Sequence, residues 1–147
     1  IIQTYNEKHF VLRKVLENDY KGFYAKEKAD RENMGYPPFT RIALIETKDT
    51  SMDKAKGAAY DFYKEIIKYK NYLKISDPTT AQIFKLLNNY RYHILIKSNK
   101  ENDPGGAILR KAILEAWTEF NKKSRYKDVK LFYDVDPQSI MWDLKTL

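Results

Sequence analysis

The most constraining stretch of the chain is a glycine–aromatic–proline–proline corner at residues 35–38, which leads into an apolar run at residues 42–45. Proline has no amide hydrogen to donate, and its ring clashes with the preceding helical turn. Each proline also moves the residue before it out of the helical region of backbone space. The charged segment before the corner is therefore predicted to be a helix that ends there. The run after it is predicted to be a buried strand.

A boundary between two parts of the chain is predicted near this corner. Residues 1–33 are predicted to be a mainly helical segment, and residues 34–147 a separate domain. Hydrophobic spacing in the first part predicts a short strand and two helices, at residues 1–5, 8–17 and 19–33. The chain opens on the apolar pair Ile1-Ile2 without a methionine, so we expect it to be part of a longer protein.

The second part is predicted to be an α+β domain. Its elements follow the order strand, helix, strand, strand, helix, strand. Residues 79–90 show no clear periodicity and are predicted to be a loop. This βαββαβ order predicts a four-stranded sheet with two helices packed on one face and the other face open. The predicted elements are residues 40–47, 52–70, 73–75, 91–98, a helix that begins at Asp103-Pro104, and residues 129–135.

Composition limits the classes of protein to which the chain can belong. It has 147 residues, of which 43% are hydrophobic and 32% are charged, so it is too apolar for disorder and too charged for a membrane protein. Cysteine is absent, which excludes a disulfide framework and agrees with the cytoplasmic location that we expect. The net charge of +7 favours polyanionic partners such as nucleic acid.

Basic and aromatic side chains concentrate around the strand at residues 91–98. Its alternation predicts one face with Tyr92, Ile94 and Ile96 and an opposite face with Arg91, His93, Leu95 and Lys97. A basic sheet face with aromatics suits single-stranded or forked DNA, because cations meet the phosphates while rings stack on the bases. The alternative is a solvated face that only keeps the domain in solution. The candidate DNA-binding residues are Lys85, Tyr90, Arg91, His93, Lys97 and Lys130.

No catalytic or metal-binding group is predicted. His9 and His93 are far apart in the sequence, and without cysteines a zinc site would need carboxylates. Asp134 and Asp136 have a spacing that could hold Mg²⁺, but we favour a structural role at the sheet edge. The sequence has no glycine-rich phosphate loop and no Ser-His-Asp grouping, so we expect no cofactor in this chain.

Three blocks of sequence, in the same order, resemble the PriA family, the replication-restart DNA helicases also called primosomal protein N′. The first is the opening stretch at residues 1–6 with His9. The second is the helix that runs into the Gly-Tyr-Pro-Pro-Phe corner. The third joins the strand at residues 90–97 to the Asp-Val-Asp-Pro motif at residues 134–137. The chain departs from the family pattern at Asn88-Asn89, where asparagine still tolerates a left-handed turn.

This resemblance implies a function for the longer protein. The family implies an ATP-dependent 3′-to-5′ DNA helicase that restarts stalled replication forks by primosome assembly. Residues 1–33 would then be the end of the second helicase lobe with its connecting helices, and residues 34–147 a C-terminal domain that binds DNA and docks partners. The implied partners are forked or single-stranded DNA, the tail of single-stranded-DNA-binding protein and other primosome proteins.

The implied cofactors of the longer protein are ATP, Mg and Zn, whose binding motifs are not in this chain. The chain alone is therefore expected to hydrolyse no ATP, and ATPase activity of the pure fragment would contradict this. Two alternatives stay open. The domain could be a structural cap that braces the helicase lobes, or an independent RNA- or ribosome-associated βαββαβ protein.

Overall fold

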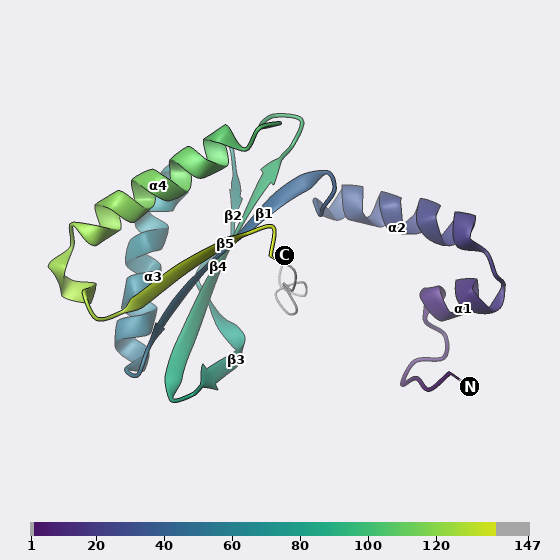
Figure 1. Cartoon of the computed structure of the whole chain (residues 1–147), viewed down its shortest axis with the longest axis horizontal. Coiled ribbons are helices and arrows are strands. Elements are labelled where there is room, and N and C mark those ends of the chain that lie inside the picture. Colours follow the sequence, from purple (N-terminus) through teal and green to yellow (C-terminus); the bar gives the residue numbers. More distant parts are fainter. Residues whose placement is uncertain (1, 138–147) are drawn as a thin grey trace.

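A twisted antiparallel sheet with two long helices on one face forms the body of the molecule (Figure 1). The computed structural model describes residues 2–137. The strand order is β2-β4-β1-β5, and β3 pairs with β4 beside β2. The strands are β1 (Thr40–Asp49), β2 (Lys74–Ile75), β3 (Thr79–Leu86), β4 (Asn89–Asn99) and β5 (Lys130–Val135).

The two helices on the sheet are α3 (Met52–Ile66) and α4 (Ala107–Asn121), followed by short 3₁₀ turns at Ile67–Tyr69 and Ser124–Tyr126. Each helix turns an apolar stripe with helical spacing toward the sheet. Alanines such as Ala58 and Ala112 are fully buried, and the rings of Phe62 and Phe120 meet edge to face with centroids 6.1 Å apart. These side chains, with the inward residues of β1 and β4, form the main hydrophobic core.

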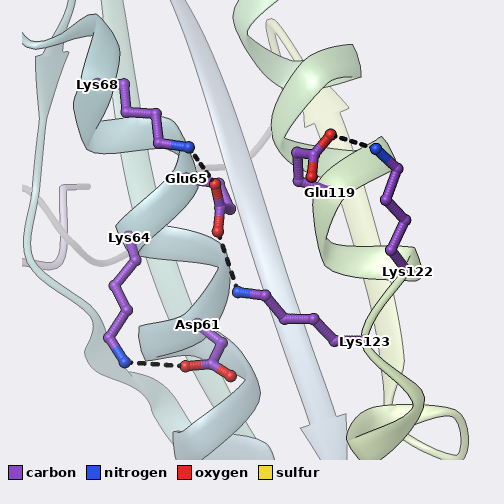
Figure 2. A network of polar contacts seen from close by, with 7 residues as sticks. All are labelled: Asp61, Lys64, Glu65, Lys68, Glu119, Lys122 and Lys123. Atoms are coloured by element: carbon purple, nitrogen blue, oxygen red, sulfur yellow. Dashed lines mark hydrogen bonds and ion pairs between the residues drawn. The ribbon is translucent and has the colours of Figure 1, made fainter.

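Ion pairs line the outer sides of α3 and α4 (Figure 2). Lys123 Nζ lies 3.0 Å from Glu65 and joins the end of α4 to α3. The other pairs in Figure 2 join residues three positions apart in the chain, and they are Lys68 with Glu65, Lys64 with Asp61, and Lys122 with Glu119. Exposed pairs of this kind contribute at most about 1 kcal/mol each. They also neutralise these four lysines, which weakens the attraction of this part of the surface for a polyanion.

The first part of the chain forms α1 (Phe10–Leu16) and α2 (Tyr20–Met34), which extend away from the sheet (Figure 1). Asp19 caps α2 by accepting a hydrogen bond from the amide of Gly22 at 2.9 Å. Gly35 ends α2 in the left-handed conformation, with φ of +63°, which favours glycine. Phe10 and Phe23 stack between the two helices. Other apolar side chains of this pair are exposed: Val15, Leu16, Tyr20 and Tyr24.

The α+β class is confirmed, and helices are found at all the predicted places, but three details of the prediction are wrong. Residues 79–90 are not a loop, because β3 and β4 form a hairpin, so the sheet has five strands instead of four. The irregular pairing between Thr80 and Lys85 breaks the alternation that would identify a strand. The turn places Leu87 and Asn88 at positive φ, as two-residue hairpin turns require.

The other two corrections concern the first predicted strand and the start of the last helix. Residues 2–5 form no strand; an isolated strand without a pairing partner is unstable in water. The last helix begins at Ala107, after a turn, and not at Pro104. Asp103 still caps it from outside, because its carboxylate accepts hydrogen bonds from the amides of Ile108 and Leu109.

Candidate nucleic-acid interface

The sheet face opposite α3 and α4 carries a row of three cations. The register pairs Lys48 of β1 with Arg91 of β4 on one side and with Lys130 of β5 on the other. Directly paired residues project from the same face, and neighbouring strands lie about 4.8 Å apart. Three positive side chains from three strands therefore lie side by side. We call Arg91, Lys48 and Lys130 the cation row, and the face that carries it the helix-free face.

An exposed aromatic ring adjoins the cation row. Phe132 of β5 is 47% exposed, and Lys48 Nζ lies 4.4 Å from the centroid of its ring. A lysine over a ring is a favourable cation–π contact, and here it sets a positive charge beside a free aromatic surface. Within residues 2–137, neither Lys48 nor Lys130 forms an ion pair. These two charges are therefore available to a ligand.

The next row of the same face places Glu46 of β1 between His93 of β4 and Phe132 of β5. Arg91 Nη2 lies 2.5 Å and His93 Nε2 lies 2.8 Å from the same oxygen of Glu46. Burial acts to raise the pKa of this carboxyl, but the hydrogen bonds from His93 and Arg91 and the charge of Arg91 outweigh it and lower the pKa from 4.5 to about 2. Arg91 is thus partly neutralised and held in place by Glu46.

Lys97 lies on the helix-free face but its side chain is buried. It is 6% exposed, its Nζ donates a hydrogen bond to the carbonyl oxygen of Met34 at 3.2 Å, and the ring of Tyr36 lies 4.0 Å away. Burial lowers its pKa, and the nearby charge of Lys74 lowers it further. Lys97 therefore fixes the end of α2 against the sheet, and only a small part of its side chain reaches the surface.

Lys85 and Tyr90 lie on the opposite face of the sheet. Tyr90 packs beside Phe84 in a small cluster that includes Ala55 and Ala59 of α3. Lys85 Nζ lies 4.8 Å above the ring of Tyr90. Of the six candidate residues, the structure therefore places four on the helix-free face, which are Arg91, His93, Lys97 and Lys130, and separates the other two from them. That any of the six binds DNA stays a prediction.

Lys48 is the member of the cation row that the sequence did not single out. It follows Glu46 at a two-residue spacing, which is typical of an exposed strand face. This alternation could have indicated its face, but not its neighbours. Those depend on the register between β1, β4 and β5.

The described residues offer no metal centre. Within residues 2–137, no three His, Asp or Glu side chains come together as a metal site would need. His9 caps α1, where its Nδ1 accepts a hydrogen bond from an amide, and His93 is bound to Glu46. The carboxylate of Asp136 accepts a hydrogen bond from the amide of Ile42, and the amide of Asp136 donates one to the carbonyl oxygen of Ile42. These bonds agree with the structural role at the sheet edge that the sequence analysis favours for Asp136. None of the helices in this range has the length and apolar character to cross a membrane.

Comparison with known proteins gives a consistent match. A family model described as the primosomal protein N C-terminal domain matches residues 32–138. The chain is 36% identical over 98 residues to the replication restart protein PriA of Thermotoga maritima, which covers 67% of this chain and 13% of that protein. It is 30% identical over 149 residues to PriA of Bacillus subtilis, covering 96% and 17%. It is 31% identical over 144 residues to PriA of Haemophilus influenzae, covering 95% and 18%. The chain thus spans less than a fifth of these relatives.

Proposed function

Because the chain belongs to the family described as the primosomal protein N C-terminal domain, we propose that it is the DNA-binding C-terminal module of a replication restart protein. The longer protein would be an ATP-dependent 3′-to-5′ DNA helicase that assembles the primosome at stalled forks. Its motor would lie outside this chain. Docking to the tail of single-stranded-DNA-binding protein and to other primosome proteins is proposed from the family resemblance alone.

The cation row beside Phe132 is the observation that carries this proposal. Lysines without acidic partners gain the most from phosphate contact, because they release the counterions of the nucleic acid without breaking an internal pair. An exposed ring next to them offers a surface on which a base can stack. The paired lysines on the outer sides of α3 and α4 offer neither feature (Figure 2).

Reversing the two free charges of the row is expected to weaken DNA binding. We expect K48E/K130E to lower the affinity for a forked oligonucleotide by about tenfold or more at low salt, and to reduce the salt dependence by about two phosphate contacts. Fluorescence anisotropy over a salt series measures both. The matched control is K56E/K111E, which changes the net charge equally at exposed positions of α3 and α4. Equal losses in the two double variants would contradict an interface at the cation row.

Phe132→Ala separates stacking from charge. Loss of one base–ring contact is expected to weaken binding by roughly 1 kcal/mol or more without changing the salt slope. An unchanged affinity would remove Phe132 from the interface.

A second candidate function is to brace the helicase lobes. The exposed apolar side chains of α1 and α2 favour it, because Val15, Leu16, Tyr20 and Tyr24 lack a covering partner surface in the described range. This function predicts no DNA binding by the chain even at low salt, so the anisotropy series distinguishes the two candidates.

A further inference from the structure

A second concentration of positive charge lies away from the cation row, in a cleft between the end of α2, β2 and the turn after β4. Lysines reach this cleft from three directions: Lys70 and Lys74 from around β2, Lys97 from β4, and Lys100 from the turn. Two acidic residues, Glu32 and Glu101, also line it. We call the four residues Lys70, Lys74, Lys97 and Lys100 the lysine cleft.

The buried member of the cleft is the unusual one. The β2–β4 register pairs Lys74 directly with Lys97, so two ammonium groups project from the same face of the sheet. Only 6% of Lys97 is exposed. Among the residues that the structure describes, its ammonium group contacts the carbonyl oxygen of Met34 and the ring of Tyr36. Within residues 2–137, no carboxylate pairs with Lys97 or with Lys74.

Such an arrangement is energetically unfavourable as it stands. Burying an ammonium group is costly unless an opposite charge accompanies it, and the neighbouring Lys74 adds repulsion. The direction of the effect on Lys97 agrees, since burial and the charge of Lys74 both disfavour its protonated form. An anion in the cleft would neutralise both lysines and replace the water that Lys97 has lost.

We propose that the lysine cleft binds a phosphate group, supplied either by a free phosphate ion or by a DNA backbone. A phosphate presents several acceptor oxygens, which suits ammonium donors that converge from three elements better than the two oxygens of one carboxylate. Lys97 is six positions after Arg91 on β4, which corresponds to about 20 Å along the strand. The cleft is therefore distinct from the cation row, although one nucleic acid strand could reach both.

Titration with inorganic phosphate tests the site directly. The chain, labelled with ¹³C at lysine, is titrated at pH 7 and constant ionic strength, with chloride as the balancing anion, and the Cε resonances are followed by NMR. We expect the Lys74 and Lys97 signals to shift to saturation. K74Q should weaken phosphate binding by about fivefold or more, as expected for the loss of one charge-assisted contact. K97M, which keeps the buried stem, should abolish it.

The control variant is K64Q, which removes an exposed lysine of α3 and should leave the titration unchanged. A uniform, unsaturated shift of all lysines would overturn the proposal. So would equal phosphate binding by K74Q and K97M. A peptide of aspartate and glutamate that saturates the same signals at lower concentration would overturn the assignment to phosphate in favour of a carboxylate partner.

A short oligothymidine without terminal phosphates identifies the source of the phosphate. If the source is DNA, the oligonucleotide displaces inorganic phosphate and K74Q loses DNA affinity. If the source is free phosphate, the Lys97 signal responds to the ion and not to the oligonucleotide. Both results support the site. The inorganic arm does not depend on DNA binding by the cation row, so this inference and the proposed function can fail separately.

Discussion

Replacing Asp103 with alanine is expected to destabilise the chain by about 3 kcal/mol, because three donors would lose their acceptor together. Asp103 is 5% exposed, and its carboxylate accepts hydrogen bonds from the Ser98 hydroxyl and from the amides of Ile108 and Leu109. It thus joins the end of β4 to the start of α4. Urea unfolding followed by circular dichroism measures the loss, and thermal unfolding should show a decrease of roughly 10 °C.

The control for this change is Asp128→Ala, which removes the same charge from an exposed turn and should change stability by less than about 0.5 kcal/mol. Burial acts to raise the pKa of Asp103, but the hydrogen bonds from Leu109, Ile108 and Ser98 lower it below 3.8. The stability from this group is therefore present above pH 3.8 and is lost as the pH falls below it. A D103A variant as stable as wild type would contradict its role as the cap of α4.

Replacing Glu46 with glutamine is expected to cost roughly 2 to 3 kcal/mol at pH 7 and to flatten the acid dependence of stability. The folded pKa of about 2 lies below the unfolded value of 4.5. The contribution of the carboxylate is thus complete above about pH 4.5 and disappears as the pH falls toward 2. Denaturant unfolding at pH 7, 4.5 and 3 should show wild type losing more stability than E46Q over this range.

The exposed Glu101→Gln is the matched control, because it removes the same charge without breaking an ion pair and should leave the wild-type pH profile intact. E46Q also has an effect on binding that a purely structural role would not produce. Without the carboxylate of Glu46, the charge of Arg91 is no longer neutralised. We therefore expect the folded E46Q variant to bind DNA several-fold more tightly than wild type at low salt. Equal pH profiles for E46Q and wild type would contradict the Arg91–Glu46–His93 arrangement.

Several local features of the fold could be predicted from the sequence. The glycine–proline corner ends α2, since Gly35 supplies the left-handed residue and the prolines cannot continue a helix. The apolar spacing of α3 and α4 identifies the faces that are buried. The alternation in β4 correctly separates Tyr92, Ile94 and Ile96, which are in the core, from Arg91 and His93 on the other face. The sequence did not indicate the β3–β4 hairpin, because irregular pairing removes the alternation of polar and apolar residues in β3.

The candidate site was only partly predictable. The sequence could place Lys130 and Phe132 on one face of their strand, and the register confirms that this is the helix-free face. It could not show that Lys48 lies between Arg91 and Lys130, or that Glu46 holds Arg91 across 45 residues of chain. It also could not show that Tyr36 and Met34 cover Lys97.

What the chain determined by itself is therefore local: where helices stop, which side of each element is apolar, and a positive balance of charge. These follow from backbone sterics and from side-chain periodicity within a few residues. Only the tertiary structure decided which cations are free, which are paired and which are buried. The reason is that register and packing are fixed by the whole core at once, and a charge's solvation and partners depend on neighbours that are distant in the sequence.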